Sequence, residues 1–322
     1  MEKRFDYIDI AKGIAIFLVV YIHIFGMSDK FPNWIAIIIA SLDNPTFYFA
    51  SGILFKRSFE SKDGKSILIE RGMNLLIPFF IWCCVYSAYV YTIVKVTISD
   101  YKFSYMNVAN KLWFLPVLFL TFCVSTFIIK TKLDFKKTIM IFLLVITLSS
   151  FLSSLIAKII SYSLIVYIGT IYYDLTKNGK KKLGAICFIM CLLLWILCVL
   201  SNWIKIQDTC TSGIKLLIFL INSIFGGIGL VSVIDYACDW LPKTIKGVIA
   251  SLGRRSLYVY ILHFIFVYWM EVTRESNADI FILLLSIVTP ILLAQCISQN
   301  IMNVLLFKPS CLFTIHKNGD QL

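Results

Sequence analysis

The stretch DIAKGIAIFLVVYIH, from Asp9 to His23, is almost wholly apolar, yet it holds a lysine at position 12 and ends on a histidine. About 20 mostly apolar residues suffice for a helix to cross the hydrocarbon core of a bilayer. In such a helix, the eleven residues from Lys12 to His23 make three turns plus about 20° and advance the chain by about 16.5 Å. Lys12 and His23 are therefore predicted to share one face of a membrane-spanning helix, with Asp9 about 40° from His23.

The composition of the whole chain agrees with a membrane protein. The 322 residues are 59% hydrophobic and 15% charged, with a mean hydropathy of +0.86. Soluble proteins average roughly 45–50% apolar and about 25% charged residues. We therefore predict an all-α, polytopic integral membrane protein, with one membrane domain over residues 1–310 and a short cytoplasmic tail over 311–322.

Apolar segments of spanning length recur along the chain, and they predict about ten transmembrane helices. The predicted spans are Ile8–Phe25, Trp34–Phe55, Met73–Val94, Leu112–Ile129, Thr138–Ile156, Ile159–Tyr173, Leu183–Ile204, Ile214–Ala237, Ile249–Trp269 and Ile280–Phe307.

The basic residues indicate how these spans are oriented. The two termini and alternate connections together hold 21 of the 30 lysines and arginines. Because such residues concentrate on the cytoplasmic side, both termini are predicted to be cytoplasmic, in a bacterial-type cytoplasmic (inner) membrane. The formal charge of +12 is spread over short topology-like clusters, so no nucleic-acid partner is expected. The ten cysteines form no CxxC pattern, and no metal site is predicted.

The polar face of the first span is compatible with two kinds of role. A charge at the centre of a span costs about 2.5–3.5 kcal/mol, so this face is expected to line protein or water. Lys12 could extend toward the interface and pair with Asp9, and His23 could form a structural hydrogen bond between helices. The alternative is a functional site, because histidine, with an ordinary pKa near 6.5, is well suited to act as a general base.

The run KGIAIFLVVYIH, a lysine followed by ten residues and a histidine, resembles the arginine/lysine–ten–histidine motif of membrane-bound acyltransferase family 3. Its flanking residues resemble the branch that includes fucose 4-O-acetylases. Four later stretches agree in order with the family: PTFYFASGILF (45–55), RGMNLLIPFF (71–80), KLWFLPVLF (111–119) and SLGRRSLYVYILHF (251–264).

The resemblance implies a membrane O-acyltransferase, with acetyl as the expected group. Acetyl-CoA or another acyl-CoA would be the cytosolic donor and a substrate, and no tightly bound cofactor is expected. The acceptor would be a carbohydrate hydroxyl of a cell-envelope or secreted glycan, with a lipid-linked form as one option. His23 would act as general base or carry the acyl group transiently. The partners are then acyl-CoA, the carbohydrate and the lipid bilayer.

Two basic residues are candidates for handling the donor. Lys12 could hold a phosphate or the pantetheine arm, or stabilise negative charge that develops on the thioester oxygen. Arg71, at the cytoplasmic end of the third predicted span, could bind the phosphates of coenzyme A bidentately. It could equally be an ordinary cytoplasmic anchor of that span.

Asp43 is the carboxylate placed deepest in a predicted span, and it could orient His23 as an acidic partner. Relatives in the branch that the chain resembles often have a histidine at this place. The sequence Asp43-Asn44-Pro45 also predicts a break in the second helix, because a residue before proline avoids helical geometry and asparagine suits a helix cap.

Three further residues are candidates for binding substrate. Ser51 belongs to a serine–glycine step that the family shares, although close packing of helices explains such a step equally well. Trp113 could stack on a sugar ring or lie at the membrane interface. His263, in YILHF, is interpreted as structural or donor-lining.

The main alternative function is a transporter or flippase for a lipid-linked saccharide. Many spans and a polar helix face would fit that function as well. Transporters often carry polar breaks in corresponding helices of two repeated halves, and the sequence shows one predicted break with no counterpart. A glycan polymerase would be expected to have a larger outer loop.

Overall fold

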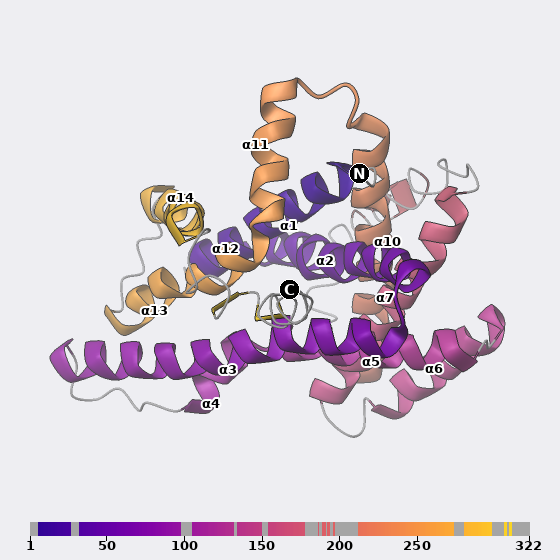
Figure 1. Cartoon of the computed structure of the whole chain (residues 1–322), viewed down its shortest axis with the longest axis horizontal. Helices are drawn as coiled ribbons and strands as arrows, with labels where there is room; N and C mark the ends of the chain where they lie inside the picture. The colour runs from indigo at the N-terminus through magenta and orange to yellow at the C-terminus, as the bar shows by residue number, and fades with distance from the viewer. Residues whose placement is uncertain are drawn as a thin grey trace, which may run out of the picture. The chain divides into compact units, whose positions relative to one another are not determined.

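The computed structural model describes residues 6–26, 32–97, 105–131, 134–149, 154–177, 212–273 and 280–297, with short pieces within 186–196 and 306–310. Every regular element in these ranges is a helix (Figure 1). Among the described residues, six helices are long and apolar enough to cross a membrane, and two shorter apolar helices lie nearer the C-terminus. The total of ten spans stays a prediction, since most of the predicted seventh span, 183–204, lies outside the described residues.

The chain divides into two compact units, each described here by itself. Unit 1 comprises Met1–Val19, Phe31–Lys62 and Leu120–Arg254, and unit 2 comprises Val20–Lys30, Asp63–Phe119 and Arg255–Leu322. Helices α1 (Asp6–Phe25) and α5 (Phe114–Thr131) contribute residues to both. The other helices of unit 1 are α2 (Asn33–Ser61), α6 (Phe135–Ser149), α7 (Ser154–Lys177), α10 (Ser212–Ala237) and α11 (Lys243–Arg254). Those of unit 2 are α3 (Gly64–Thr97), α4 (Tyr105–Lys111), α12 (Ser256–Leu262), α13 (Phe264–Thr273) and α14 (Ile280–Ile297).

In unit 1, glycines bring the backbones of neighbouring helices together. Helix α2 crosses α7 where a Cβ added to Gly52 would overlap the carbonyl oxygen of Val166, and one added to Gly169 would overlap that of Phe49. Small residues allow such close approach, which is a main source of helix association in membranes. The glycine of the Ser51–Gly52 step therefore serves helix packing, while Ser51 itself is half-buried.

The predicted break in the second helix is wrong, because α2 runs unbroken through Pro45. Proline lacks an N–H, so the carbonyl of Ser41 one turn earlier loses its usual donor. The Cα of Gly226 in α10 lies directly against that carbonyl oxygen, and a Cα–H group can serve as a weak donor. The hydroxyl of Thr46 donates to the carbonyl of Leu42. A neighbouring helix thus covers the carbonyl that proline frees, while α2 stays helical.

The predicted ninth span, Ile249–Trp269, is also revised. It is divided into α11, α12 and α13, with interruptions at Arg255 and His263. Arg255 takes the N-cap position of α12 with φ −102° and ψ 13°, outside helical values. At His263 the ring Nδ1 lies 3.0 Å from the carbonyl oxygen of Val259, where it adds to the backbone N–H bond to the same oxygen. The interruption at His263 is slight, because its backbone keeps helical values (φ −63°, ψ −24°) and its carbonyl accepts from the N–H groups of Phe266 and Val267.

Unit 2 joins α3 to the interrupted segment through tyrosines. The hydroxyl of Tyr86 donates to the carbonyl of Ile261 at 2.6 Å, and that of Tyr89 donates to the carbonyl of Ile265 at 3.1 Å. These carbonyls flank the interruption at His263. Tyrosine hydroxyls therefore satisfy backbone acceptors beside the interruption, as an apolar setting requires.

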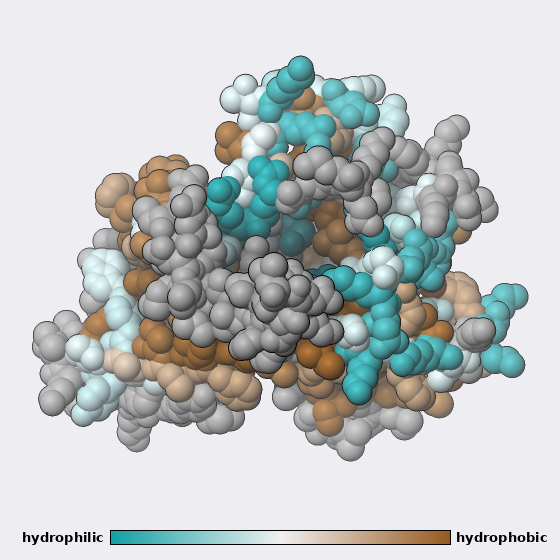
Figure 2. Space-filling model, in the orientation of Figure 1, coloured by the Kyte–Doolittle hydropathy of each residue, from teal (hydrophilic) through white to brown (hydrophobic). Residues whose placement is uncertain are grey.

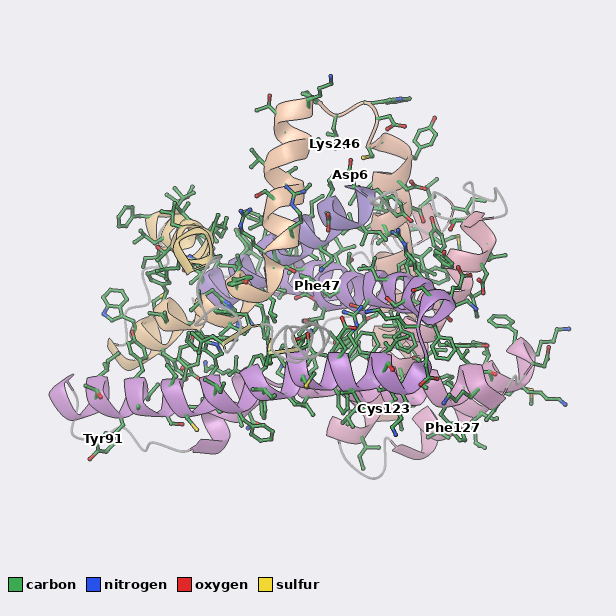
Figure 3. All side chains as sticks on the ribbon, in the orientation of Figure 1. Asp6, Phe47, Tyr91, Cys123, Phe127 and Lys246 are labelled. Atoms are coloured by element: carbon green, nitrogen blue, oxygen red, sulfur yellow. The ribbon has the colours of Figure 1, made fainter. Side chains whose placement is uncertain are left out.

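Helix α3 carries several exposed apolar side chains: Ile69, Ile77, Phe80, Val85 and Tyr91. Figure 2 shows hydrophobic residues along the visible part of this helix, and Figure 3 shows Tyr91 projecting from its far end. In unit 1, by contrast, hydrophilic residues gather around the N-terminal end of α11 (Figure 2). Exposed apolar side chains of this kind suit contact with lipid, in keeping with the candidate span Gly64–Ile93.

Candidate active site

His23 lies near the C-terminal end of α1, in unit 2. Its ring is half-buried and makes no hydrogen bond to any described residue. The ring of Phe264 packs against it edge-on, with 5.2 Å between centroids. The imidazole thus has an apolar wall on one side.

His263 lies beside His23, with ring centroids 5.3 Å apart and planes tilted by 41°. Its side chain is completely buried. The oxygen of Val259 can only accept, so the 3.0 Å contact requires Nδ1 of His263 to carry the proton. The lone pair of the neutral ring then belongs to Nε2, which has no hydrogen-bond partner among the described residues. The sequence predicted both histidines as site residues, and the structure brings them together.

An ion pair completes the polar groups of this region. Lys111, the last residue of α4, places its Nζ 2.8 Å from Oε2 of Glu271 in α13. The same ammonium lies over the ring of Tyr268, 5.3 Å from its centroid. The backbone carbonyl of Lys111 accepts a 3.1 Å hydrogen bond from Tyr260, whose ring packs on His263 at 6.0 Å. The pair is therefore linked to the two histidines through a single tyrosine side chain.

Lys111, Glu271 and Tyr260 were not predicted as site residues. Lys111 begins the stretch KLWFLPVLF (111–119) but was given no role in the site, and no sequence pattern relates it to Glu271. A signal did exist for Tyr260, which precedes His263 by three residues and so shares its helix face. Contact between the remaining residues depends on tertiary structure.

Lys12 lies half-buried in the part of α1 that belongs to unit 1. Helix α1 is unbroken between Lys12 and His23, so the helical register that relates the two residues holds. The residue after Lys12, Gly13, meets the backbone of Ile249 in α11.

Two ionic contacts tie the start of α1 to α11. The carboxylate of Asp9 lies 4.0 Å from the guanidinium of Arg254, and that of Asp6 lies 3.6 Å from Lys246 (Figure 3). Asp9, which the sequence offered as a partner for Lys12, thus also contacts a neighbouring helix. The first turns of α1 are anchored by charge as well as by glycine packing.

Asp43 is buried in unit 1, in the middle of α2, with 5% of its surface exposed. Its carboxylate accepts a hydrogen bond from the backbone N–H of Asn44 and acts electrostatically on Tyr162 of α7, which stacks on Tyr48 at 4.1 Å. A buried acidic side chain inside a span is a functional candidate by default. Its pairing with His23 stays a prediction.

The other predicted residues occupy separate positions in their units. Arg71 is half-buried near the start of α3, next to Gly72, which contacts the ring of Phe119. Trp113 is half-buried in the turn between α4 and α5, two residues after Lys111. Among the described residues, no three His, Cys, Asp or Glu side chains gather as a metal ion would need.

The fold and the histidine pair describe an all-helical protein with several candidate membrane spans and a site able to handle a proton in an apolar setting. A comparison with known protein families matches residues 5–298 to the acyltransferase domain of acyltransferase family 3. The chain therefore belongs to acyltransferase family 3. The narrower resemblance to fucose 4-O-acetylases is not tested by this match. Comparisons with curated proteins and with solved structures gave no match.

Proposed function

We propose that the protein is a membrane O-acyltransferase that moves an acyl group, with acetyl as the expected one, from cytosolic acyl-CoA to a hydroxyl of a cell-envelope or secreted glycan. Family membership supports acyl transfer as the class of reaction. The observation that supports base catalysis at this site is the half-buried ring of His23 beside the fully buried ring of His263. The expected location is the cytoplasmic membrane of a bacterial-type cell.

His23 acts as the general base in this proposal. It takes the proton of the acceptor hydroxyl while the oxygen attacks the thioester carbon, so a C–O bond forms and the C–S bond breaks. Coenzyme A leaves as a thiolate, which takes up the proton. Such base catalysis typically contributes about 10²–10⁴-fold to the rate. An acyl-histidine formed on His23 is the alternative course, with water-free transfer to the hydroxyl in a second step.

His263 is proposed as a positioning residue for His23. Its Nδ1 proton is committed to Val259, which leaves the Nε2 lone pair as an acceptor. The two rings lie side by side, with centroids 5.3 Å apart. An acceptor at this place would orient His23 and stabilise the imidazolium that forms during proton transfer, the part that a carboxylate plays in hydrolytic triads.

The other predicted residues take supporting roles. Lys12 would stabilise charge on the thioester oxygen or contact the donor, and Arg71 would hold the phosphates of coenzyme A. Asp43 stays a candidate acidic partner for the catalytic centre. Ser51 and Trp113 are proposed to contact substrate, Trp113 through its indole face.

The proposal is tested by measuring ester-linked acetyl on the surface glycan by mass spectrometry. Cells lacking the protein are complemented with wild type, His23→Ala or His316→Ala at matched expression. His316→Ala is the matched control, because it removes the histidine of the C-terminal tail. We expect wild type and His316→Ala to restore the ester and His23→Ala to fail.

Two results would contradict the proposal in different ways. Full acetylation with His23→Ala would remove His23 from catalysis. Acetylation that never depends on the protein, combined with a change in the amount of surface glycan, would favour the transporter or flippase.

A further inference from the structure

The ion pair between Lys111 and Glu271 is partly shielded, because Oε2 of Glu271 is itself buried while other atoms of both side chains are reachable. The Lys111 side chain is 26% exposed and that of Glu271 is 35% exposed, with 2.8 Å between Nζ and Oε2. The ring of Tyr268 beneath the ammonium and the hydrogen bond from Tyr260 to the Lys111 carbonyl fix the lysine from two sides. A pair held in this way loses little further freedom when it binds a ligand.

The pair lies close to the proposed catalytic base. Tyr260 connects the Lys111 backbone to the ring of His263, which packs on His23. The ammonium acts electrostatically on both imidazoles. The distribution of basic residues predicts Lys111 and Glu271 near the outer face, the side on which an envelope glycan would be presented.

We propose that Lys111 and Glu271 form the subsite that holds the acceptor sugar, and that the sugar is a neutral one. This inference rests on the proposed function. An ammonium only donates hydrogen bonds and a carboxylate only accepts them, whereas each sugar hydroxyl does both. Two hydroxyls on adjacent carbons can therefore bridge the pair, one donating to Glu271 and the other accepting from Lys111. A third hydroxyl of the same ring is then presented to His23.

The chemical class follows from the balance of charge. Lys111 and Glu271 already neutralise each other, so an acidic sugar would bring a second carboxylate beside Glu271 without an added cation. Like charges at such distances are disfavoured. The half-buried indole of Trp113, two residues from Lys111, offers an apolar surface for the face of a neutral ring.

The competing explanation is that the pair only fastens α4 to α13. Exchanging the two charges distinguishes the explanations. A structural ion pair is restored in the double variant Lys111→Glu/Glu271→Lys, whereas a subsite matched to particular hydroxyls is not. Glu271→Gln and Lys111→Gln are the single variants, and Asp174→Asn is the matched control, since it disrupts the 3.2 Å pair with Lys56 in unit 1.

Binding is measured on the full chain in lipid nanodiscs by saturation-transfer NMR, with the methyl α-glycosides of glucose, galactose, mannose and glucuronic acid as probes. Wild type is expected to bind at least one of the neutral glycosides more tightly than the glucuronoside. Loss of a hydrogen bond to a charged group should weaken that binding at least about tenfold in Glu271→Gln and Lys111→Gln. The charge-exchanged variant should stay weak while its thermal unfolding returns to that of wild type, and Asp174→Asn should bind normally.

Several results would overturn the inference. They are no binding of any neutral glycoside to wild type, tighter binding of the glucuronoside, unchanged binding in both single variants, or restored binding in the charge-exchanged variant. Failure of the proposed function is read separately, from the ester-linked acetyl that cells make with wild type. If acetylation depends on the protein but glycoside binding is unchanged in Glu271→Gln, the subsite proposal is contradicted while the proposed acyltransferase function still holds.

Discussion

Unit 1 contains the crossing of α2 and α7, and unit 2 contains the histidine region. The crossing is formed by backbone contacts, whereas the histidine region is formed by side-chain contacts. At the crossing, backbone meets backbone at Gly52, and no side chain separates the helices. In the histidine region, side chains make the contacts, and Nε2 of His263 has no described partner. A crossing closed by backbone contact has room only for packing, whereas a region built from imidazoles and tyrosines can accept a proton or a ligand.

The largest expected effects separate the two regions through the histidines. His23→Ala should lower acyl transfer by about 10²–10⁴-fold, and His263→Ala by about 10- to 100-fold through the lost orientation of His23. The double variant should be no slower than His23→Ala alone, because residues that act through one another are not additive. Initial rates of transfer from labelled acetyl-CoA in proteoliposomes test this. Multiplicative losses would show that His263 acts independently, and thermal unfolding of each variant checks that the fold is kept.

The next effect concerns the crossing. Gly52→Ala places a methyl group against the backbone of Val166, which cannot move aside as a flexible side chain can. We expect a loss of about 1–3 kcal/mol of stability, seen as a lower midpoint in thermal unfolding. Gly247→Ala in α11 is the control, because nothing lies within 4 Å of its added methyl group and alanine favours a helix by about 1 kcal/mol. Equal unfolding midpoints in the two variants would contradict the claim that the close backbone contact at Gly52 stabilises the fold.

The two regions also differ in what the sequence could predict. Hydrophobic length predicted the helices, and the Lys12–His23 spacing on α1 depended only on helical geometry. The break expected at Pro45 was wrong, and the carbonyl of Ser41 that proline frees is covered by Gly226 of another helix. Local rules describe what proline does to its own helix, and they contain nothing about a neighbour that covers the freed carbonyl.

The candidate site was predicted in part for the same reason. His23 and His263 were both singled out from their motifs, but the meeting of their rings is a tertiary contact between segments far apart in the chain. From the sequence alone, Lys111 and Glu271 are each interpreted as ordinary charged residues at the ends of spans, where such residues are common. Only the fold pairs them, so no sequence pattern could have predicted the proposed acceptor subsite.

A smaller effect is expected for Arg71, and it tests the proposed contact of this residue with the donor. Arg71→Lys keeps the charge but removes the planar fork that can hold a phosphate with two hydrogen bonds. We expect the KM for acetyl-CoA to rise about tenfold, with the KM for the acceptor unchanged. Lys65→Gln, which removes an exposed charge from the same end of α3, should leave both constants near wild type. A rise caused equally by Lys65→Gln would indicate a general effect of surface charge.

The smallest effect is expected for Tyr86, and it asks whether the interruption beside His263 is supported by α3. Tyr86→Phe removes the hydroxyl that donates to the Ile261 carbonyl at 2.6 Å and leaves the ring in place. Losing such a hydrogen bond should cost about 0.5–1.5 kcal/mol of stability. Because Ile261 lies two residues before His263, a small fall in the rate of acyl transfer should accompany the lower unfolding midpoint. Thr92→Val, which removes an exposed hydroxyl from the same helix, should change neither. A lower midpoint with an unchanged rate would mean that the geometry of His263 is set within its own segment, without help from α3.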